Sequence, residues 1–239
     1  MMGNQKFTVF EVAGDLAHFR RPYAITTALT FPIPPRTALC GLVGAVLGLP
    51  KNDGLRHFSD VDATFGIEIL EPLKTTSFSL NLLDTKDNPT FRPKAENPHS
   101  PMRYEFIRGP RYRVLFSHRD LGSPLAEALR CGESVYTPCL GLAWLIAWFG
   151  ETVEVREAEW ITSRSRVACR SLVRSDDLVG PVDWDQQGVY QRIRMPAEMQ
   201  PDRLVRSYRE YIIETTGSSI SADLCGHWKL ADGTCFCAM

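Results

Sequence analysis

The segment from Gly14 to Pro50 reads GDLAHFRRPYAITTALTFPIPPRTALCGLVGAVLGLP, and it dominates the interpretation of the whole chain. Between Asp15 and Asp53 it has no acidic side chain and four basic ones: Arg20, Arg21, Arg36 and Lys51. The chain as a whole has a formal net charge of -1, so it has no general attraction for nucleic acid. Binding to an anionic polymer must therefore depend on local basic patches such as this one.

The second half of this segment predicts a helix that begins after Pro34-Pro35 and ends before Pro50. Small residues at i, i+3, i+4 and i+7 form a stripe on one face of it: Gly41, Gly44, Ala45 and Gly48. Each glycine inside a helix costs about 0.8–1 kcal/mol relative to alanine, so the stripe implies close approach by another backbone or by a ligand. Taken alone, it fits a helix packed on a sheet. The spacing of a nucleotide-binding P-loop is missing, because no Gly-Lys-Ser/Thr sequence follows.

The length of 239 residues fits either two domains or one domain with an appendage, and a hydrophobic fraction of 44% is ordinary for a folded protein. The seven cysteines are odd in number and scattered, which favours a reducing compartment. No signal peptide and no unbroken apolar stretch long enough to span a bilayer is apparent. We therefore expect a cytoplasmic protein without a membrane anchor.

The order of predicted elements indicates an α+β fold, with a ferredoxin-like, RRM-like domain over residues 1–150. Besides the helix after Pro35, the elements are strands over Phe7–Val12, Ala63–Leu70 and Lys74–Leu83, a helix over Ser123–Arg130 and a mostly buried strand over Tyr136–Phe149. Residues 151–239 predict a small β-rich unit. In it we expect a β pair of Thr152–Ile161 with Ser163–Val173, a strand over Val189–Met195, a helix over Asp202–Ile213 and a hairpin that turns at Ala231–Gly233.

A long insertion, Asp84–Asp120, separates the third predicted strand from the second helix. From Phe91 to Arg119 it carries seven basic residues against two glutamates, and the aromatics Tyr104, Phe106 and Tyr112 are interleaved with the cations. Single-stranded RNA is commonly held by stacking of its bases on aromatic rings and arginine planes. The alternative is a solvated hairpin whose aromatic rings pack beneath it.

Read in order, several motifs resemble the fifth Cas family of the CRISPR-associated RAMP proteins. The resemblance rests on the strand at Phe7–Val12, the G-[DP]-x-x-x-F segment at Gly14–Phe19, the polar loop Arg20–Thr30, the proline-rich turn Phe31–Leu39 and the glycine-rich helix Gly41–Gly48. Later matches are Tyr136–Gly141 (YTPCLG) and the MPAEMQPDRLV segment, Met195–Val205.

The resemblance implies a subunit of a type I CRISPR Cascade surveillance complex, of a subtype similar to I-B, which binds and caps the 5′ handle of the crRNA. It also implies contacts with the backbone subunit and the large PAM-reading subunit of Cascade, and a position near target DNA beside the PAM. The insertion would form a thumb that folds over the RNA. We expect RNA contacts from the segment of the first helix and its preceding loop, and from the thumb: Arg20, Arg21, Tyr23, Thr26, Arg36, Thr37 and Gly41, with Arg103, Arg108, Arg111, Arg113 and His118.

Some members of the resembled family cut the precursor RNA without metal, using a tyrosine, a lysine and a histidine. Residues of these types are present at His18, Tyr23, Lys94, Tyr112 and His118. The cutting members place a lysine directly before the histidine, whereas here Ser117 precedes His118. We therefore expect a non-catalytic RNA-binding protein, with the metal-independent endoribonuclease as the alternative.

Cys225, His227, Cys235 and Cys237 gather near the C-terminus, but their pairs lack the two-residue spacing of structural zinc sites. Sequence motifs of serine hydrolases and zinc proteases are also missing. We expect neither a metal nor another cofactor.

Overall fold

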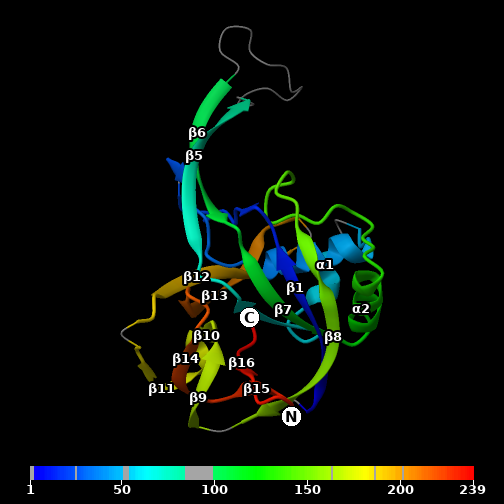
Figure 1. The fold of residues 1–239 in the computed structure, drawn as a ribbon, viewed down its shortest axis with the longest axis vertical. Helices are drawn as coiled ribbons and strands as arrows, with labels where there is room; N and C mark the ends of the chain where they lie inside the picture. Colours follow the sequence, from blue (N-terminus) through cyan, green and yellow to red (C-terminus); the bar gives the residue numbers. More distant parts are fainter. Residues whose placement is uncertain are drawn as a thin grey trace.

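The computed structural model describes residues 3–24, 26–50, 54–83, 99–162, 164–185, 187–200 and 202–239. Its centre is a curled nine-stranded sheet in the order β11-β14-β9-β16-β15-β8-β1-β7-β4, and a long hairpin projects from the body (Figure 1). Two α-helices, α1 (Arg36–Leu47) and α2 (Gly122–Arg130), occur in the described ranges. None of the helices in these ranges is long and apolar enough to cross a membrane.

The N-terminal part has the βαββαβ order of a ferredoxin-like domain, so the predicted fold class is confirmed. Its elements are β1 (Gln5–Ala13), α1, β4 (Ala63–Ile69), β7 (Arg111–His118), α2 and β8 (Trp148–Ile161), and its strands lie side by side in the order β8-β1-β7-β4. All three pairings between neighbouring strands are antiparallel. α2 packs on β1, β7 and β8, while α1 packs against α2 and the later strand β12 (Tyr190–Met199).

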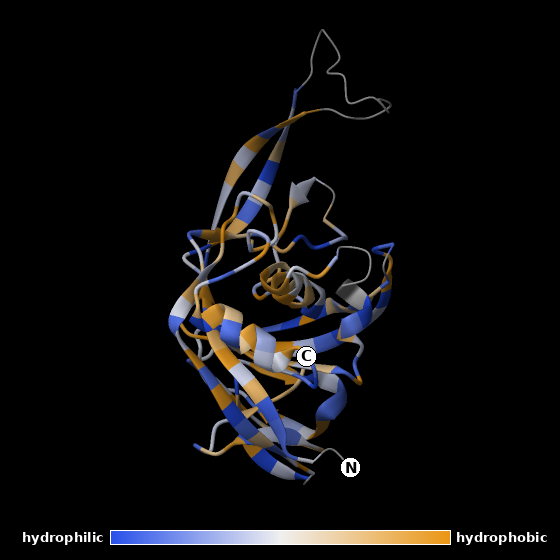
Figure 2. Ribbon diagram, turned by 90° about the vertical axis from the view of Figure 1, so that its right-hand side faces the viewer, coloured by the Kyte–Doolittle hydropathy of each residue, from blue (hydrophilic) through white to orange (hydrophobic). Residues whose placement is uncertain are grey.

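The projecting hairpin consists of β5 (Lys74–Leu83) and β6 (His99–Arg108), which pair along their whole length. Its position corrects the prediction: the insertion follows the second strand of the domain, and β7 rather than β5 is the third. The physical reason is burial, because side chains of β5 are largely exposed, whereas most of those on β7 are buried. Hydrophilic and hydrophobic residues alternate along the two strands of the hairpin, as expected for strands outside a core (Figure 2).

Two short strands, β2 (Leu16–Ala17) and β3 (Thr27–Ala28), pair with the edge of β6 that β5 leaves free. The base of the hairpin is thus hydrogen-bonded to the loop of the cationic segment. The predicted strand Tyr136–Phe149 is wrong over most of its length, because residues 131–147 form turns and an isolated bridge, and β8 begins only at Trp148.

The C-terminal half is rich in β-structure, as predicted, and continues the main sheet. Its further strands are β9 (Ser165–Arg170), β10 (Leu172–Arg174), β11 (Leu178–Asp183), β13 (Val205–Glu214), β14 (Ser219–Leu224), β15 (His227–Leu230) and β16 (Cys235–Phe236). β8 and β9 exist but do not pair with each other, because β15 and β16 lie between them. The proposed division into residues 1–150 and 151–239 stays a prediction, and residue 150 lies inside β8.

The helix predicted over Asp202–Ile213 is wrong: these residues form most of β13, which pairs with β12 on one side and β10 on the other. β-Branched and aromatic side chains such as Val205, Tyr211 and Ile213 favour a strand that packs on both neighbours. This small sheet brings the Met195–Val205 segment next to α1.

Candidate nucleic-acid interface

Helix α1 begins after Pro35 and ends at Gly48, whose left-handed backbone (φ 70°) lets its N–H and that of Leu49 reach the carbonyl of Gly44. One face of α1 is buried in the main core and carries Leu39, Leu42, Val43 and Val46. The other face carries the small residues. A Cβ atom placed on Gly41 would meet no atom within 4 Å, and one on Gly44 only the Leu49 side chain at 3.8 Å. The stripe therefore faces open space at Gly41 and Gly44, whereas Gly48 at its end packs against Val135.

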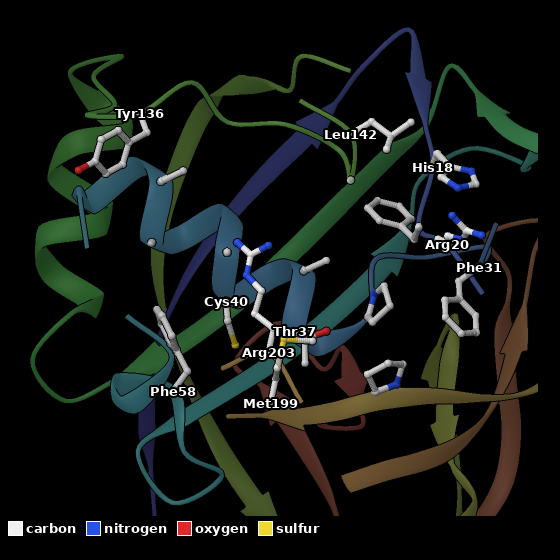
Figure 3. A pocket seen from close by; sticks show the side chains of 18 of the residues that line it. His18, Arg20, Phe31, Thr37, Cys40, Phe58, Tyr136, Leu142, Met199 and Arg203 are labelled. Carbon is white, nitrogen blue, oxygen red and sulfur yellow. The ribbon is translucent and has the colours of Figure 1, made fainter. Parts of the chain in front are cut away.

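The open space is a groove of about 770 Å³ (Figure 3). α1 contributes Thr37, Ala38, Gly41, Gly44 and Ala45, and the loop after β2 contributes His18, Arg20 and Phe31. Tyr136, Gly141 and Leu142 line it from the turns before β8, and Pro196, Met199 and Arg203 from β12 and the chain that follows. The groove has a mainly apolar wall with basic groups and, among the described lining residues, no carboxylate.

Arg36 does not lie on the surface of this groove, and its predicted role as an RNA contact is wrong. Its side chain is only 2% exposed, and its guanidinium donates hydrogen bonds to the carbonyls of Phe58 (3.0 Å), Ala197 (3.3 Å), Ser59 (3.1 Å) and Ala63 (2.9 Å). Asp60 balances its charge at 3.5 Å. A buried guanidinium needs such partners, because an unpaired charge in an apolar interior is very unfavourable. Arg36 therefore holds α1 to the chain over residues 58–63 and to β12.

The loop between β2 and α1 presents part of the predicted set. Arg20 is exposed and lines the groove, and Tyr23 and Thr26 are exposed outside it. Arg21 is partly used within the protein, because its Nε donates to the Thr30 carbonyl at 2.7 Å and its guanidinium lies 5.7 Å from the centre of the Phe31 ring. The loop contributes an open cation, Arg20, at the groove.

The base of the hairpin lies beside that loop. β3 pairs Thr27 with Arg103, and the Glu105 carboxylate on β6 accepts a hydrogen bond from the Thr30 backbone N–H at 3.0 Å. Arg103 and Arg108 are exposed on β6, as predicted for the thumb. The structure thus brings the loop and part of the thumb together.

The aromatic residues of the insertion are not the stacking platform that the sequence suggested. Tyr104, Phe106 and Tyr112 are all buried. The rings beside them that remain exposed are Phe78, stacked on Phe106 with a centroid distance of 4.4 Å, and Trp144, 5.7 Å from Phe106. The alternative in which the aromatics pack beneath the hairpin is therefore closer to the structure.

Arg111 and Arg113 are misplaced by the prediction, because they lie on β7 and not on the thumb. Arg111 pairs with Glu71 (2.7 Å) and Glu11 (3.1 Å), and Arg113 with Glu68 (2.9 Å) and Glu11 (3.2 Å). Thr8 on β1 points to the start of α2, because its hydroxyl bonds the Gly122 carbonyl. Side chains alternate between the two faces of a sheet, so Glu11, three residues later, points to the opposite face together with its cross-strand neighbour Arg113. These ion pairs therefore lie on the face of the sheet opposite to α2. The two arginines are far from the small-residue face of α1.

His118 and the other candidate acid–base residues do not form one cluster. His118 Nδ1 accepts hydrogen bonds from the backbone N–H groups of Asp120 (3.0 Å) and Leu121 (3.1 Å), which leaves Nε2 as the donor to the His57 carbonyl at 2.9 Å. Tyr112 is buried, donates to the Pro32 carbonyl at 2.8 Å, and lies six residues from His118 along β7, roughly 20 Å away. Burial raises the pKa of the Tyr112 hydroxyl. Lys94 lies outside the described residues.

His18 is the buried polar group of the groove. Its Nδ1 lies 2.7 Å from the Glu105 carbonyl and must donate to it, because a carbonyl only accepts. The side chain is 1% exposed, and its Nε2 has no hydrogen-bond partner among the described residues. Burial lowers the pKa of His18, and the nearby Arg20 charge adds to this effect. The imidazole is therefore held neutral, with an acceptor nitrogen left over.

The sequence analysis missed the groove residues that come from later segments, such as Tyr136, Met199 and Arg203. A signal was present: both segments, Tyr136–Gly141 and Met195–Val205, belong to the motifs that carry the resemblance. They received no role in the site, because the predicted helix and strand at these places gave no reason to put them beside α1.

Clusters of three or more potential metal ligands do not occur in the described part of the chain. The C-terminal cysteines are mainly buried, and Cys237 Sγ lies 3.8 Å from Cys169 Sγ.

Comparison with solved structures agrees with this architecture. A chain of a "CRISPR RNA-guided surveillance complex" matches with a TM-score of 0.53 and 13% identity, over 89% of this chain and 91% of that chain. Weaker matches are a chain of a Type III-B Cmr-beta complex bound to cognate target RNA (TM-score 0.48, 14% identity, 90% and 86% covered) and a CRISPR protein from Archaeoglobus fulgidus (0.45, 13%, 96% and 97%). The first of these likenesses shows that this chain shares its overall fold with that chain.

A model of one family, described as "CRISPR-associated protein (Cas_Cas5)", matches residues 7–116. This range contains the cationic segment, α1 and the hairpin. This part of the chain is therefore similar to the Cas5 family of CRISPR-associated proteins. A search of curated protein sequences gave no match.

Replacing Arg36 by alanine should lower the free energy of unfolding by about 3–5 kcal/mol, because four carbonyls and Asp60 would lose a buried partner. Urea denaturation followed by circular dichroism would measure this. The matched control is Arg192→Ala, which removes an exposed partner of Glu210 and should cost at most about 1 kcal/mol. Equal stability of the two variants would contradict the structural role of Arg36.

The lowered pKa of His18 predicts a pH dependence of stability. In the unfolded chain the His18 side chain has the ordinary pKa of 6.5, so it takes up a proton at a higher pH than in the folded chain. The free energy of unfolding should therefore fall as the pH drops below about 6.5. His227 adds an effect of the same sign, because its pKa is also lowered by burial. His18→Asn, which keeps a donor for the Glu105 carbonyl, should make the dependence between pH 7 and pH 5 shallower in denaturant titrations. An unchanged dependence would argue against a neutral, buried His18.

Proposed function

We propose that the protein is a non-catalytic subunit of a type I CRISPR surveillance complex that binds the 5′ handle of the crRNA in the groove along α1, beneath the projecting hairpin. The observation that carries this proposal is the groove itself, in which the small-residue face of a helix lies open and two exposed arginines but no carboxylate line the described wall. The match of residues 7–116 to a Cas5 family model supports an assignment to CRISPR effector complexes.

The chemistry of the groove suits a single-stranded polynucleotide. Gly41 and Gly44 let a phosphodiester backbone approach α1 closely, because they have no Cβ. The first turn of α1 has no acidic residue, so its free backbone N–H groups favour an anion. Tyr136, an exposed ring that lines the groove, offers a face for base stacking, which is worth about 1–3 kcal/mol per base.

The partners follow from this assignment. Arg103 and Arg108 would cover the handle from the hairpin. Exposed apolar side chains outside the groove, among them Trp148, Val155 and Val179, supply surface for the backbone subunit and the large PAM-reading subunit of the complex. Contact with target DNA near the PAM would come through that large subunit or beside it. The type I subtype, similar to I-B, is part of the same proposal.

The non-catalytic role is favoured by the dispersal of the candidate acid–base groups. Tyr112 is enclosed and bonded to the Pro32 carbonyl, while both ring nitrogens of His118 have backbone partners at the far end of β7. A metal-independent ribonuclease needs such groups within hydrogen-bond reach of one scissile phosphate.

Arg20→Ala and Arg103→Ala should each weaken binding of a handle-bearing RNA by the full-length protein. Each lost phosphate contact should also reduce the slope of log affinity against log salt concentration by about 0.7. Fluorescence anisotropy at several salt concentrations measures both quantities. Arg111→Ala removes the same charge from the opposite face of the sheet and serves as the control, with binding expected to stay near the wild-type value. If all three variants bind alike, the groove is not the RNA site.

The full-length protein should leave a labelled precursor repeat RNA intact when both are incubated in EDTA, because the described residues place no cluster of the candidate acid–base groups at the groove. Denaturing gel electrophoresis would show the uncut RNA. A discrete product that disappears in the His118→Ala variant would establish the endoribonuclease alternative and contradict the non-catalytic role.

A further inference from the structure

The chain between β12 and β13 forms a wall of the groove, through Met199 at the end of β12 and Arg203 before β13. We propose that Arg203 is a phosphate-binding residue for the RNA strand, supplied by the C-terminal half of the chain, and that it holds the strand against the small-residue face of α1. This inference rests on the proposed RNA-binding function. It adds to that function one residue, Arg203, the phosphate group that it binds, and a second wall of the groove that contacts the RNA.

The first support is the direction of the side chain. Arg203 reaches from the β12–β13 connection across the front of α1, where the small-residue face lies open (Figure 3). Arg20 contributes a second guanidinium from the loop after β2. Two arginines from different walls, in a groove without carboxylates among its described lining residues, favour an anionic ligand over a neutral or basic one.

The second support is that Arg203 is unoccupied while its neighbours are engaged. Its side chain is exposed, and the described residues include no hydrogen-bond or ion-pair partner for it. On the same small sheet, Arg192 pairs with Glu210 at 2.6 Å, Arg194 lies 5.1 Å from the centre of the Tyr208 ring, and Arg209 binds Asp60 and the Met239 carbonyl. An arginine without a partner among the described residues can offer its planar set of donors to a phosphate.

The third support is the backbone that presents it. Arg203 has φ 68°, a left-handed conformation that is uncommon for residues other than glycine. Hydrogen bonds from Gln200 N to the Leu204 carbonyl (2.9 Å) and from Arg203 N to the Gln200 carbonyl (2.8 Å) hold it, and Asp202 accepts from Leu204 N at 3.0 Å. Arg203 therefore lies in a turn whose backbone is held by hydrogen bonds.

The turn is also fixed relative to α1. Arg36, in the first turn of α1, donates to the carbonyl of Ala197 at 3.3 Å, two residues before Met199. The buried arginine of the cationic segment thus positions the strand end that carries the exposed arginine. The spacing across the groove is set by this bond together with the packing of α1 on β12.

The test compares Arg203→Ala and Arg203→Lys in the full-length protein, with a fluorescently labelled, single-stranded handle RNA as the probe. Arg203→Ala should weaken binding about tenfold, and the slope of log affinity against log salt should fall by about 0.7 between about 50 and 200 mM salt. Arg203→Lys should restore the slope but only part of the affinity, because lysine keeps the charge without the two-pronged geometry. Arg203→Gly accepts the left-handed backbone without strain, so it provides the same test if the alanine variant fails to fold.

Arg192→Ala is the matched control, since it removes one exposed arginine from the same sheet outside the groove and should leave affinity and slope unchanged. The inference is overturned if Arg203→Ala or Arg203→Gly binds RNA like the wild type while Arg20→Ala binds weakly; the proposed function would then stand. It is also overturned if the Arg203 variants keep RNA binding but lose a neighbouring subunit on co-purification, which would make Arg203 a protein contact. Failure of the wild-type protein to bind the handle RNA would remove both proposals.

Discussion

The buried guanidinium of Arg36 is the interaction on which the rest of the groove depends. It satisfies carbonyls from the 3₁₀ turn η1 (Gly54–Phe58), from the chain after it, from β4 and from β12, and Asp60 neutralises it. These acceptors come from both halves of the sequence. Asp60 also binds Arg209 on β13, so this carboxylate links α1 to a second strand of the small sheet. Because one buried guanidinium bonds all of these acceptors at once, the positions of α1, β4 and β12 are fixed together.

This anchoring lets one face of α1 remain uncovered. Leu39, Leu42, Val43 and Val46 bury the opposite face, and that burial offsets the helix stability lost at Gly41 and Gly44. A helix with bulkier residues on the groove side would fill the space that Gly41 and Gly44 leave open. Glycine therefore lowers the stability of the helix at the two positions where a side chain would occupy the groove.

The general fold could be predicted because its signals are local. Proline before and after α1 and alternation in β1 and β4 lie within a few residues of the elements that they define. The helix predicted over Asp202–Ile213 failed because its outcome was decided by pairing with β12 and β10, which a local pattern does not contain. The insertion was predicted one strand too late for a similar reason. The sequences of β5 and β7 both fit a strand, and only the burial of β7 by distant residues shows that β7 is the core strand.

The candidate site was also predictable only in part, because the sequence shows local signals but not contacts between distant residues. Gly41, Thr37 and Arg20 could be found because they belong to one segment. The structure divides the four cations of that segment between different roles: Arg20 lines the groove, Arg21 binds within its own loop, Arg36 is buried, and Lys51 lies outside the described residues. A count of charges cannot separate these roles, since the acceptors of Arg36 are as distant in sequence as Ala197.

The hairpin and the groove share one mechanical support, β6. On one edge β6 pairs with β5 to form the hairpin, and on the other it holds β2 and β3, between which the Arg20 loop runs. The ring of His18 is fixed to the Glu105 carbonyl, and the Glu105 carboxylate binds Thr30, so the loop is tied to β6 at both of its ends. A displacement of the hairpin base must therefore carry Arg20 and Arg103 with it. Arg203 belongs to the other wall of the groove, because it follows β12. Movement of β6 relative to β12 would therefore change the width of the groove. Arg20 and Arg103 would keep their positions relative to β6, and Arg203 would keep its position relative to β12.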